Sequence, residues 1–264
     1  MKRYRAIAEY YDPEYAANDM LQRDVPFLLE HLPARSQRIL EIAVGTGRVA
    51  IPLAQAGHRV VGVDYAREML EIARRKRDAV GLRERELELI EANVLDFDLG
   101  RKFDVACILF NTFLNFTTLE EQDLLLENIR RHLKPRGRIW IDIFNPDPEL
   151  LAQPRSENLE PTLFYVHSLD RTVQRTTDVE RHPDLQLQRI TFRYCWFDNE
   201  GREHVERITF DLTHLFPREL QLLLERHGFE IVNLWGDYDG SDVTADSPRI
   251  ICDARLKRGR AERR

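Results

Sequence analysis

Short apolar runs alternate with amphipathic stretches over residues 38–144, a pattern that predicts a parallel sheet with helices on both faces. β-branched and aromatic residues concentrate in five of these runs, which predict strands at 38–44, 58–64, 87–94, 102–110 and 138–144. Apolar positions recur at helical spacing between the runs and predict helices at 48–57, at 66–81 and from 118 to before Pro135.

The pattern changes after Asn145. Residues 145–156 are rich in proline and polar residues. Apolar and polar residues then alternate in four segments, at 161–170, 171–180, 185–198 and 202–216. The turn residues 199–201 separate the last two segments, so residues 147–213 are predicted to form an inserted antiparallel sheet. Helical spacing returns over 217–228 and is followed by two strand-like runs, at 229–235 and 249–256. No helical segment lies between these two runs, so they must form an antiparallel hairpin.

Together these elements predict an α/β fold, namely a Rossmann-like, doubly wound seven-stranded sheet with a C-terminal antiparallel hairpin and an inserted antiparallel β-sheet. The predicted main domain comprises residues 1–146 and 214–256, of which residues 1–35 form N-terminal helices. Residues 147–213 form the insertion, and residues 257–264 form a basic tail.

The composition is that of an ordinary globular domain, with 264 residues of which 43% are hydrophobic and 32% are charged. A net charge of -6 gives no long-range attraction to a phosphate backbone. Densely basic sequence occurs only over residues 255–264, which we interpret as a solvated terminus. We therefore expect no nucleic-acid partner.

The three cysteines lie far apart in apolar runs: Cys107, Cys195 and Cys252. This spacing predicts buried reduced thiols and neither a disulfide framework nor a metal site. The N-terminus has no apolar signal core, and no stretch approaches the roughly 18 consecutive apolar residues that a membrane span needs. We expect a cytoplasmic protein without a membrane partner, either a monomer or a homodimer.

Candidate chemistry is concentrated around the loop Gly45-Thr46-Gly47, which follows the first predicted strand. Asp64 ends the second strand, where a carboxylate can accept hydrogen bonds from ribose hydroxyls. These features suit a nicotinamide dinucleotide and S-adenosylmethionine (SAM) equally. The dinucleotide spacing G-x-G-x-x-G is absent, however, and Glu41 would repel a pyrophosphate while suiting the ammonium and sulfonium charges of SAM. The alternative is that the glycines form only a turn and that Asp64 caps a helix.

The stretch "LEIAVGTGRVAIPLA" resembles the first motif of the class I SAM-dependent methyltransferases, an acidic residue followed by Gly-x-Gly-x-Gly. Ala43 replaces the first glycine of that motif. The resemblance extends from about residue 36 to the end of the chain and includes the closing hairpin. It implies SAM as the cofactor and the N-terminal helices over residues 1–35 as part of a lid.

The resemblance also implies the residues of the cofactor site. Asp64 matches the ribose ligand, with Tyr65 and Met69 near the adenine. Asn93 replaces an aspartate that meets the adenine amine, although a turn asparagine is the alternative, and Val94 would supply a backbone N–H. The complete implied set is Glu41, Ala43, Gly45, Gly47, Asp64, Tyr65, Met69, Asn93, Val94 and Phe110.

The segment "LFNTFLNF" after the fourth strand lies where the acceptor should meet the methyl group. It lacks the Asn/Asp-Pro-Pro-aromatic motif of methyltransferases that act on nucleobase or glutamine amides. The insertion and the N-terminal "YRAIAEYYDPEY" resemble the sugar N-methyltransferases and the glycine or sarcosine N-methyltransferase relatives. By that resemblance the acceptor is a small molecule.

The catalytic candidates are Tyr11, Asn111, His167 and His214, and further acceptor-side candidates are Tyr10, Tyr15, Asn115, Tyr165 and Arg193. For each of these side chains, ordinary packing is the alternative.

The sequence thus predicts a methyltransferase that moves the methyl group of SAM to N or O of a small-molecule acceptor and releases S-adenosylhomocysteine. Three alternatives stay open at this point. They are an RNA or protein methyltransferase recruited by the basic tail, a nicotinamide-dependent oxidoreductase, and a SAM-binding regulatory module without turnover.

Overall fold

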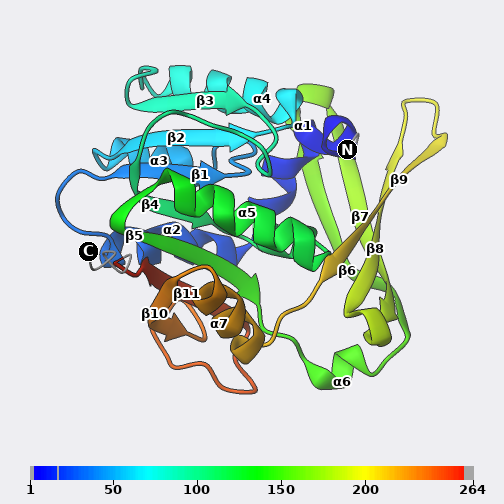
Figure 1. The fold of residues 1–264 in the computed structure, drawn as a ribbon. Helices are drawn as coiled ribbons and strands as arrows, with labels where there is room; N and C mark the ends of the chain where they lie inside the picture. Colours follow the sequence, from blue (N-terminus) through cyan, green and yellow to red (C-terminus); the bar gives the residue numbers. More distant parts are fainter. Residues whose placement is uncertain (1–2, 17, 259–264) are drawn as a thin grey trace, which may run out of the picture.

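The predicted parallel strands and the closing hairpin form one seven-stranded sheet (Figure 1). The computed structural model describes residues 3–16 and 18–258. In spatial order, the sheet consists of β10 (Phe229–Trp235), β11 (Arg249–Leu256), β5 (Leu133–Phe144), β4 (Phe103–Ile108), β1 (Arg38–Ile42), β2 (Arg59–Asp64) and β3 (Leu87–Glu91). β1 to β5 run parallel, whereas β11 pairs antiparallel with both β5 and β10. This arrangement confirms the predicted fold class.

Helices cover both faces of this sheet. α5 (Leu119–His132) and α7 (Pro217–Arg226) pack on one face in a core that contains Leu40 and Ile42 of β1. The opposite face buries Ile39 of β1 under α2 (Asp19–His31), α3 (Ala50–Gln55) and α4 (Arg67–Ala79). Because the sheet is covered on both sides, the central strands β1 and β2 are buried along nearly their whole length.

The insertion forms a separate four-stranded antiparallel sheet in the order β6-β7-β8-β9. Its strands are β6 (Arg155–Val166), β7 (Arg171–His182), β8 (Leu187–Phe197) and β9 (Glu203–Thr213). Figure 1 shows this sheet beyond the carboxyl ends of the parallel strands, with α1 (Arg3–Tyr15) between the two sheets. Short helical segments complete the chain: η1 (Thr112–Asn115), α6 (Pro148–Leu151), η2 (His167–Leu169) and η3 (Pro183–Leu185).

Two strands begin earlier than the hydrophobic pattern predicts. β5 begins at Leu133 and passes through Pro135 and Gly137, residues that usually interrupt strands. β6 begins at Arg155, six residues before the first predicted alternating segment of the insertion, and its first half is exposed and polar. β6 is an edge strand whose register with β7 shifts twice, so its outer half carries no alternating pattern that a sequence could reveal.

The cysteine prediction is correct for two residues and wrong for the third. All three thiols are free, and Cys107 and Cys252 are buried. Cys195 is only partly buried, because it lies on β8 beside Glu203 of β9.

Within residues 3–16 and 18–258, no helix is long and apolar enough to cross a membrane. The predicted basic tail lies outside the described residues from residue 259 onward.

Candidate active site

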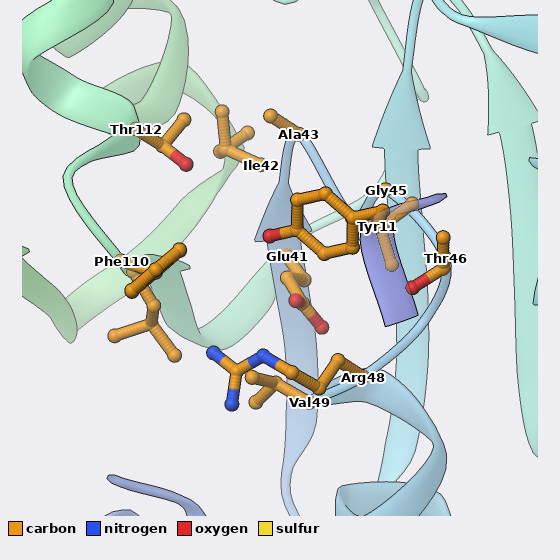
Figure 2. A pocket seen from close by; sticks show the side chains of 12 residues that line it. Tyr11, Glu41, Ile42, Ala43, Gly45, Thr46, Arg48, Val49, Phe110 and Thr112 are labelled. Carbon is orange, nitrogen blue, oxygen red and sulfur yellow. The ribbon is translucent and has the colours of Figure 1, made fainter. Parts of the chain in front are cut away.

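A pocket lies at the carboxyl end of β1, where the loop before α3 meets the segment after β4 (Figure 2). Its empty volume is about 360 Å³, part of which is open to solvent. The strand order reverses between β1 and β4, and open α/β sheets bind their ligands at such a switch point. The lining residues are Tyr11, Glu41, Ile42, Ala43, Val44, Gly45, Thr46, Arg48, Val49, Leu109, Phe110 and Thr112.

The loop after β1 depends on its two glycines. Gly45 has a φ of +55° and Gly47 a φ of +76°, a region that side-chain-bearing residues rarely adopt. A Cβ at Gly47 would also lie 3.3 Å from the side chains of Ala73 and Ile51, so α3 and α4 would have to shift slightly to admit it. Glycine at these two positions therefore allows the loop to adopt its left-handed conformation without backbone strain.

Ala43 takes the position of the first glycine of the motif and adopts a left-handed conformation, with a φ of +54°. An L-residue in this region costs about 1–2 kcal/mol relative to the right-handed conformation. Alanine in place of the first glycine therefore raises the conformational energy of the loop backbone, and its Cβ also affects how closely that backbone can approach a ligand.

Ala43→Gly is expected to raise the free energy of unfolding by up to about 1 kcal/mol, as measured by urea denaturation. Relief of the left-handed conformation exceeds the entropy that glycine adds to the unfolded chain. Ala73→Gly, inside the right-handed helix α4, is the matched control and should destabilise the protein by about 1 kcal/mol or more. Equal destabilisation by the two substitutions would contradict this account of Ala43.

Glu41 lies on β1 at the pocket with only 5% of its surface exposed. Its Oε2 has no hydrogen-bond partner among the described residues. Burial raises the pKa of Glu41 to about 8, with Arg48 opposing the shift and the charges of Asp24 and Asp64 adding to it. A buried carboxylate oxygen without a partner is costly, so the site is suited to a cationic ligand group.

Asp64 is the last residue of β2 and connects that strand to the glycine loop. Its Oδ2 accepts a hydrogen bond from Gly45 N at 2.8 Å, and its Oδ1 accepts one from Ala66 N at 2.8 Å. Burial raises the pKa of Asp64, while these backbone hydrogen bonds and one from Tyr65 oppose the shift. The carboxylate is thus held at the strand end, which is where the sequence predicts a ribose ligand.

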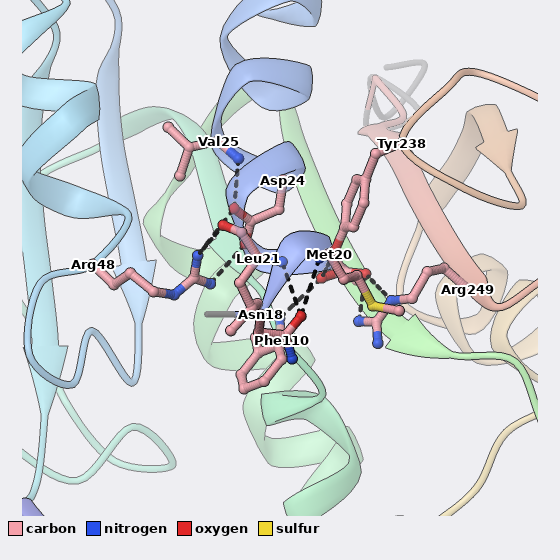
Figure 3. Close-up of polar contacts among 10 residues, drawn as sticks. Asn18, Met20, Leu21, Asp24, Val25, Arg48, Phe110, Tyr238 and Arg249 are labelled. Atoms are coloured by element: carbon pink, nitrogen blue, oxygen red, sulfur yellow. Dashed lines mark hydrogen bonds and ion pairs between the residues drawn. The ribbon is translucent and has the colours of Figure 1, made fainter. Parts of the chain in front are cut away.

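Arg48 joins the glycine loop to α2 through Asp24 (Figure 3). Its Nη1 donates to Asp24 Oδ1 at 3.0 Å and to the Leu21 carbonyl at 3.2 Å, and its Nη2 lies 2.6 Å from Asp24 Oδ2. The guanidinium also lies over the ring of Phe110, 5.5 Å from its centroid. Burial opposes the charge on Arg48, but the hydrogen bond and charge of Asp24 outweigh it and raise the pKa of Arg48. Arg48 is therefore a permanent cation at the pocket wall.

The segment after β4 is held in an uncommon conformation by buried polar groups. Phe110 and Asn111 have φ values of +51° and +61°. Phe110 N donates to Asp142 Oδ2 at 3.1 Å, and Asn111 Oδ1 accepts a hydrogen bond from Phe144 N at 2.7 Å. The amide oxygen of Asn111 therefore supports the segment, and its role as a catalytic candidate stays a prediction.

Asp142 is itself fully paired beneath this segment. Its Oδ1 accepts from Arg249 Nε at 2.9 Å and Nη2 at 2.6 Å, and its Oδ2 also accepts from Tyr238 OH at 2.8 Å. Asp142 and Arg249 are 1% and 2% exposed. The buried pair thus fixes the pocket wall to β5 and β11.

Helix α1 covers the pocket and contacts the loop below it. Tyr11 lines the pocket, and Tyr15 packs edge-on against Phe110 with 5.1 Å between ring centroids. Asp12 accepts a hydrogen bond from Thr46 Oγ1 at 2.6 Å and one from Lys76 Nζ at 2.8 Å. These contacts bond α1 to both the glycine loop and α4.

The opposite face of α1 is bonded to the second sheet. Tyr10, expected as a site residue, is 3% exposed and packs instead against Phe164 and Tyr194 of that sheet. The buried Glu14 accepts a hydrogen bond from Tyr194 OH at 2.9 Å and lies 3.0 Å from Arg175 Nε. Tyr10 therefore belongs to the packing between helix and sheet, because consecutive residues of a helix point in different directions.

The predicted adenine-side residues lie in two environments. Tyr65 and Met69 pack with Ala8 and Tyr11 of α1 in a small apolar cluster. Asn93 is exposed after β3, where its Oδ1 accepts a hydrogen bond from Leu95 N at 3.1 Å and closes a turn. The next residue, Val94, is buried, and its carbonyl accepts from Asn128 Nδ2 at 3.0 Å.

The two histidine candidates are not among the residues that line the pocket around Glu41. His167 is exposed in η2 and contacts the ring of Tyr165, with 4.8 Å between centroids. His214 is buried after β9. Burial lowers the pKa of His214, and the negative charge of Glu219 opposes this shift. Its Nδ1 has no hydrogen-bond partner within the described part of the chain. Of the remaining candidates, Arg193 donates to Asn158 and Asn115 donates to the Thr112 carbonyl.

Sequence reasoning missed two charged residues that shape the pocket. Arg48 follows Gly47 directly and is the single cation in the apolar stretch 42–54, a signal that was available in the sequence. Asp24 lies on α2, and nothing in its local sequence indicates that it pairs with Arg48.

The fold is a Rossmann-like α/β fold with a pocket at the carboxyl edge of its sheet. The methyltransferase domain family matches residues 39–137, which contain the glycine loop and Asp64. A putative methyltransferase from Geobacillus sp. (strain WCH70) is 30% identical over 244 residues, which cover 82% of this chain and 95% of the relative. The chain belongs to the class I SAM-dependent methyltransferases, and SAM is its cofactor.

Two further comparisons agree with this membership. The cypemycin N-terminal methyltransferase of Streptomyces sp is 29% identical over 227 residues, which cover 86% of each chain. The SAM-bound structure of CalS10, an amino pentose methyltransferase from Micromonospora echinaspora, shares the fold with a TM-score of 0.70. Its identity is 21%, over 94% of this chain and 96% of that chain. The nicotinamide alternative is therefore set aside.

The residues of the pocket fit SAM. The unpartnered Oε2 of Glu41 suits a cationic group. The buried Asp64 does not line the pocket itself, but it bonds to the Gly45 N of the pocket loop from the end of β2, where a carboxylate can accept hydrogen bonds from ribose hydroxyls. The assignment of individual residues to parts of the cofactor stays a prediction.

Proposed function

We propose that this enzyme transfers the methyl group of SAM to a nitrogen or oxygen of a small-molecule acceptor, with an amine as the first choice. The observation that carries the proposal is the position of the second sheet, which stands beyond the carboxyl edge of the main sheet and packs on α1 (Figure 1). In this position, the second sheet can enclose an acceptor of limited size above the cofactor pocket.

The names of two relatives support an amine acceptor. One is a cypemycin N-terminal methyltransferase and the other an amino pentose methyltransferase. The first name places the methyl group at an N-terminus, and the second refers to a sugar that carries an amino group. The segment Phe110-Asn111-Thr112-Phe113 also lacks the proline-fixed motif typical of enzymes that methylate planar amides.

When bound, SAM supplies a methyl group on a sulfonium, so the C–S bond breaks as the acceptor lone pair forms the new bond to carbon. The protein contributes chiefly position and exclusion of water. Tyr11 and Phe110 line the pocket and would restrict the approach of the acceptor, while Asp142 fixes the backbone that carries Phe110. An amine acceptor must also lose a proton, and Tyr11 is the catalytic candidate that lies at the pocket.

Isothermal titration with SAM and S-adenosylhomocysteine, with NADH and NADPH as controls, tests the cofactor half of the proposal. A screen of small amines and alcohols for formation of S-adenosylhomocysteine tests the acceptor half. Methylation of small amines in preference to total RNA and unstructured peptides is expected. Exclusive methylation of RNA or peptides would overturn the small-molecule proposal, and SAM binding without transfer to any acceptor would favour a regulatory module.

Glu41 gives the proposed cofactor site a pH dependence. The pKa of Glu41 is raised to about 8, so below that pH the carboxyl must lose a proton before it can pair with the ammonium of SAM. The affinity for SAM should therefore rise with pH between about pH 6 and about pH 8, by at most about tenfold per unit. Titration calorimetry across this range measures the slope, and Glu41→Gln should bind more weakly at the upper end with no such slope.

The same group affects the stability of the free protein. Because the folded pKa is raised above the unfolded value, the stabilising contribution is complete at low pH and is lost as the pH rises towards about 8. Glu41→Gln should therefore be more stable than the wild type at alkaline pH, with a flatter dependence of the unfolding midpoint on pH. Identical pH profiles of the two proteins, in both binding and stability, would contradict this role for Glu41.

A further inference from the structure

An acidic and a basic side chain face each other at one end of the pocket without a hydrogen bond between them. Figure 2 shows the carboxylate of Glu41 and the guanidinium of Arg48 directed towards each other from β1 and the glycine loop. Among the described residues, the carboxylate that pairs with Arg48 is Asp24, and Glu41 Oε2 has no hydrogen-bond partner. Buried acidic and basic groups with unused hydrogen-bonding atoms are costly, and a ligand that carries both a positive and a negative group can satisfy both of them.

The guanidinium of Arg48 is only partly used by the protein. Asp24 and the Leu21 carbonyl occupy Nη1 and the neighbouring side of Nη2. Within the described part of the chain, Nε–H has no acceptor, so the edge formed by Nε and Nη2 is available. This edge has the paired donor geometry that matches a carboxylate. In Figure 2 it is directed towards the interior of the pocket.

We infer that Arg48 binds the carboxylate of the amino-acid end of SAM while Glu41 binds its ammonium, so that the pocket recognises a zwitterion. The inference rests on the proposal that this pocket holds SAM. Arg48 then determines cofactor specificity, since decarboxylated SAM keeps the ammonium and the sulfonium but offers nothing to the Nε–Nη2 edge. Asp24 positions Arg48 by holding the opposite edge of its guanidinium.

Four ligands separate the parts of this inference. SAM and S-adenosylhomocysteine carry both the ammonium and the carboxylate, decarboxylated SAM carries only the ammonium, and 5′-methylthioadenosine carries neither. The dissociation constant of each ligand is measured by titration calorimetry for the wild type and for the variants. Every comparison is made at one pH, because Glu41 titrates.

The main variant combines Arg48→Met with Asp24→Asn, so that neither member of the Arg48–Asp24 pair is left as an unpaired buried charge. It should weaken binding of SAM and S-adenosylhomocysteine by about 10- to 100-fold. Decarboxylated SAM and 5′-methylthioadenosine should bind as they do to the wild type. Arg67→Met, on the exposed side of α4, is the control and should change none of the four constants.

Arg48→Lys provides a second test, which can be used if the main variant fails to fold. It keeps the charge beside Asp24 but loses the two-donor edge, so a smaller loss is expected, again confined to the two ligands with a carboxylate. An equal loss of affinity for all four ligands, or no loss of affinity for any of them, would show that Arg48 only supports the loop and would overturn the inference.

Asp64→Asn distinguishes the failure of this inference from the failure of the proposed function. If the pocket holds the cofactor, this variant should weaken all four ligands, because each carries the ribose. If Asp64→Asn weakens the binding of all four ligands but the Arg48 variants do not weaken the two ligands with a carboxylate selectively, the inference about Arg48 is rejected and the proposed function is not. No effect of Asp64→Asn would reject the assignment of the pocket to SAM.

Discussion

Asp142→Asn is expected to lower the free energy of unfolding by about 3–5 kcal/mol, because it leaves Arg249 as an uncompensated buried cation. Asp142 and Arg249 are almost fully buried, and the carboxylate accepts two hydrogen bonds from the guanidinium. Urea denaturation at neutral pH measures the loss. Asp211→Asn, which removes a partner of Arg189 from an exposed pair, is the matched control and should leave the midpoint nearly unchanged.

The same substitution should weaken SAM binding beyond its effect on stability. Asp142 Oδ2 accepts the hydrogen bond of Phe110 N, which keeps Phe110 and Asn111 in their left-handed conformations at the pocket. Replacing the whole pair, with Asp142→Leu and Arg249→Met, should recover part of the stability but not the SAM affinity. A protein with Asp142→Asn that loses less than about 1 kcal/mol would contradict the structure of this pair.

Asp64→Asn is the second substitution for which we expect a large effect, a loss of about 10- to 100-fold in SAM affinity. In the proposed cofactor site, the substitution removes the charge that would strengthen hydrogen bonds from the ribose hydroxyls. It also replaces one of the two oxygens, which accept from Gly45 N and Ala66 N, by an amide that cannot accept. Titration calorimetry with SAM measures the loss.

Glu91→Gln provides the control for this measurement. Glu91 pairs in register with Asp64 at the end of the neighbouring strand β3, but it is exposed. Removing its charge should leave the affinity for SAM almost unchanged. Equal effects of the two substitutions would show that SAM responds only to the general charge of the sheet edge.

The sequence was sufficient to predict the main fold because each element carries its own local signal. Strands buried on both faces appear as continuous apolar runs, and Gly57, Gly81 and Gly228 end the helices before them. The closing hairpin followed from the absence of a helix between its two strands. The beginnings of β5 and β6 were missed because Pro135 and Gly137 in one, and register shifts in the other, interrupt the usual pattern.

The candidate site was predictable only where its residues are close in sequence. Glu41 near the end of β1 and Gly45 and Gly47 in the loop that follows lie within seven residues of one another, and they line or support one pocket. Asp142 could not be predicted as a support of this pocket, because its partner Arg249 lies 107 residues away. Tyr10 and Tyr11 show a second limit, since adjacent tyrosines in one motif face the second sheet and the pocket respectively.

The contacts of α1 have a consequence for protein engineering. The second sheet is continuous in sequence from β6 to β9, which suggests that a relative's sheet could be exchanged to change the acceptor. However, Glu14 of α1 is buried against Arg175 and Tyr194 of this sheet. A chimera with a foreign sheet and the native helix would bury Glu14 without its partners. The exchangeable unit is therefore a pair of segments, the N-terminal helix and the sheet, which lie more than a hundred residues apart.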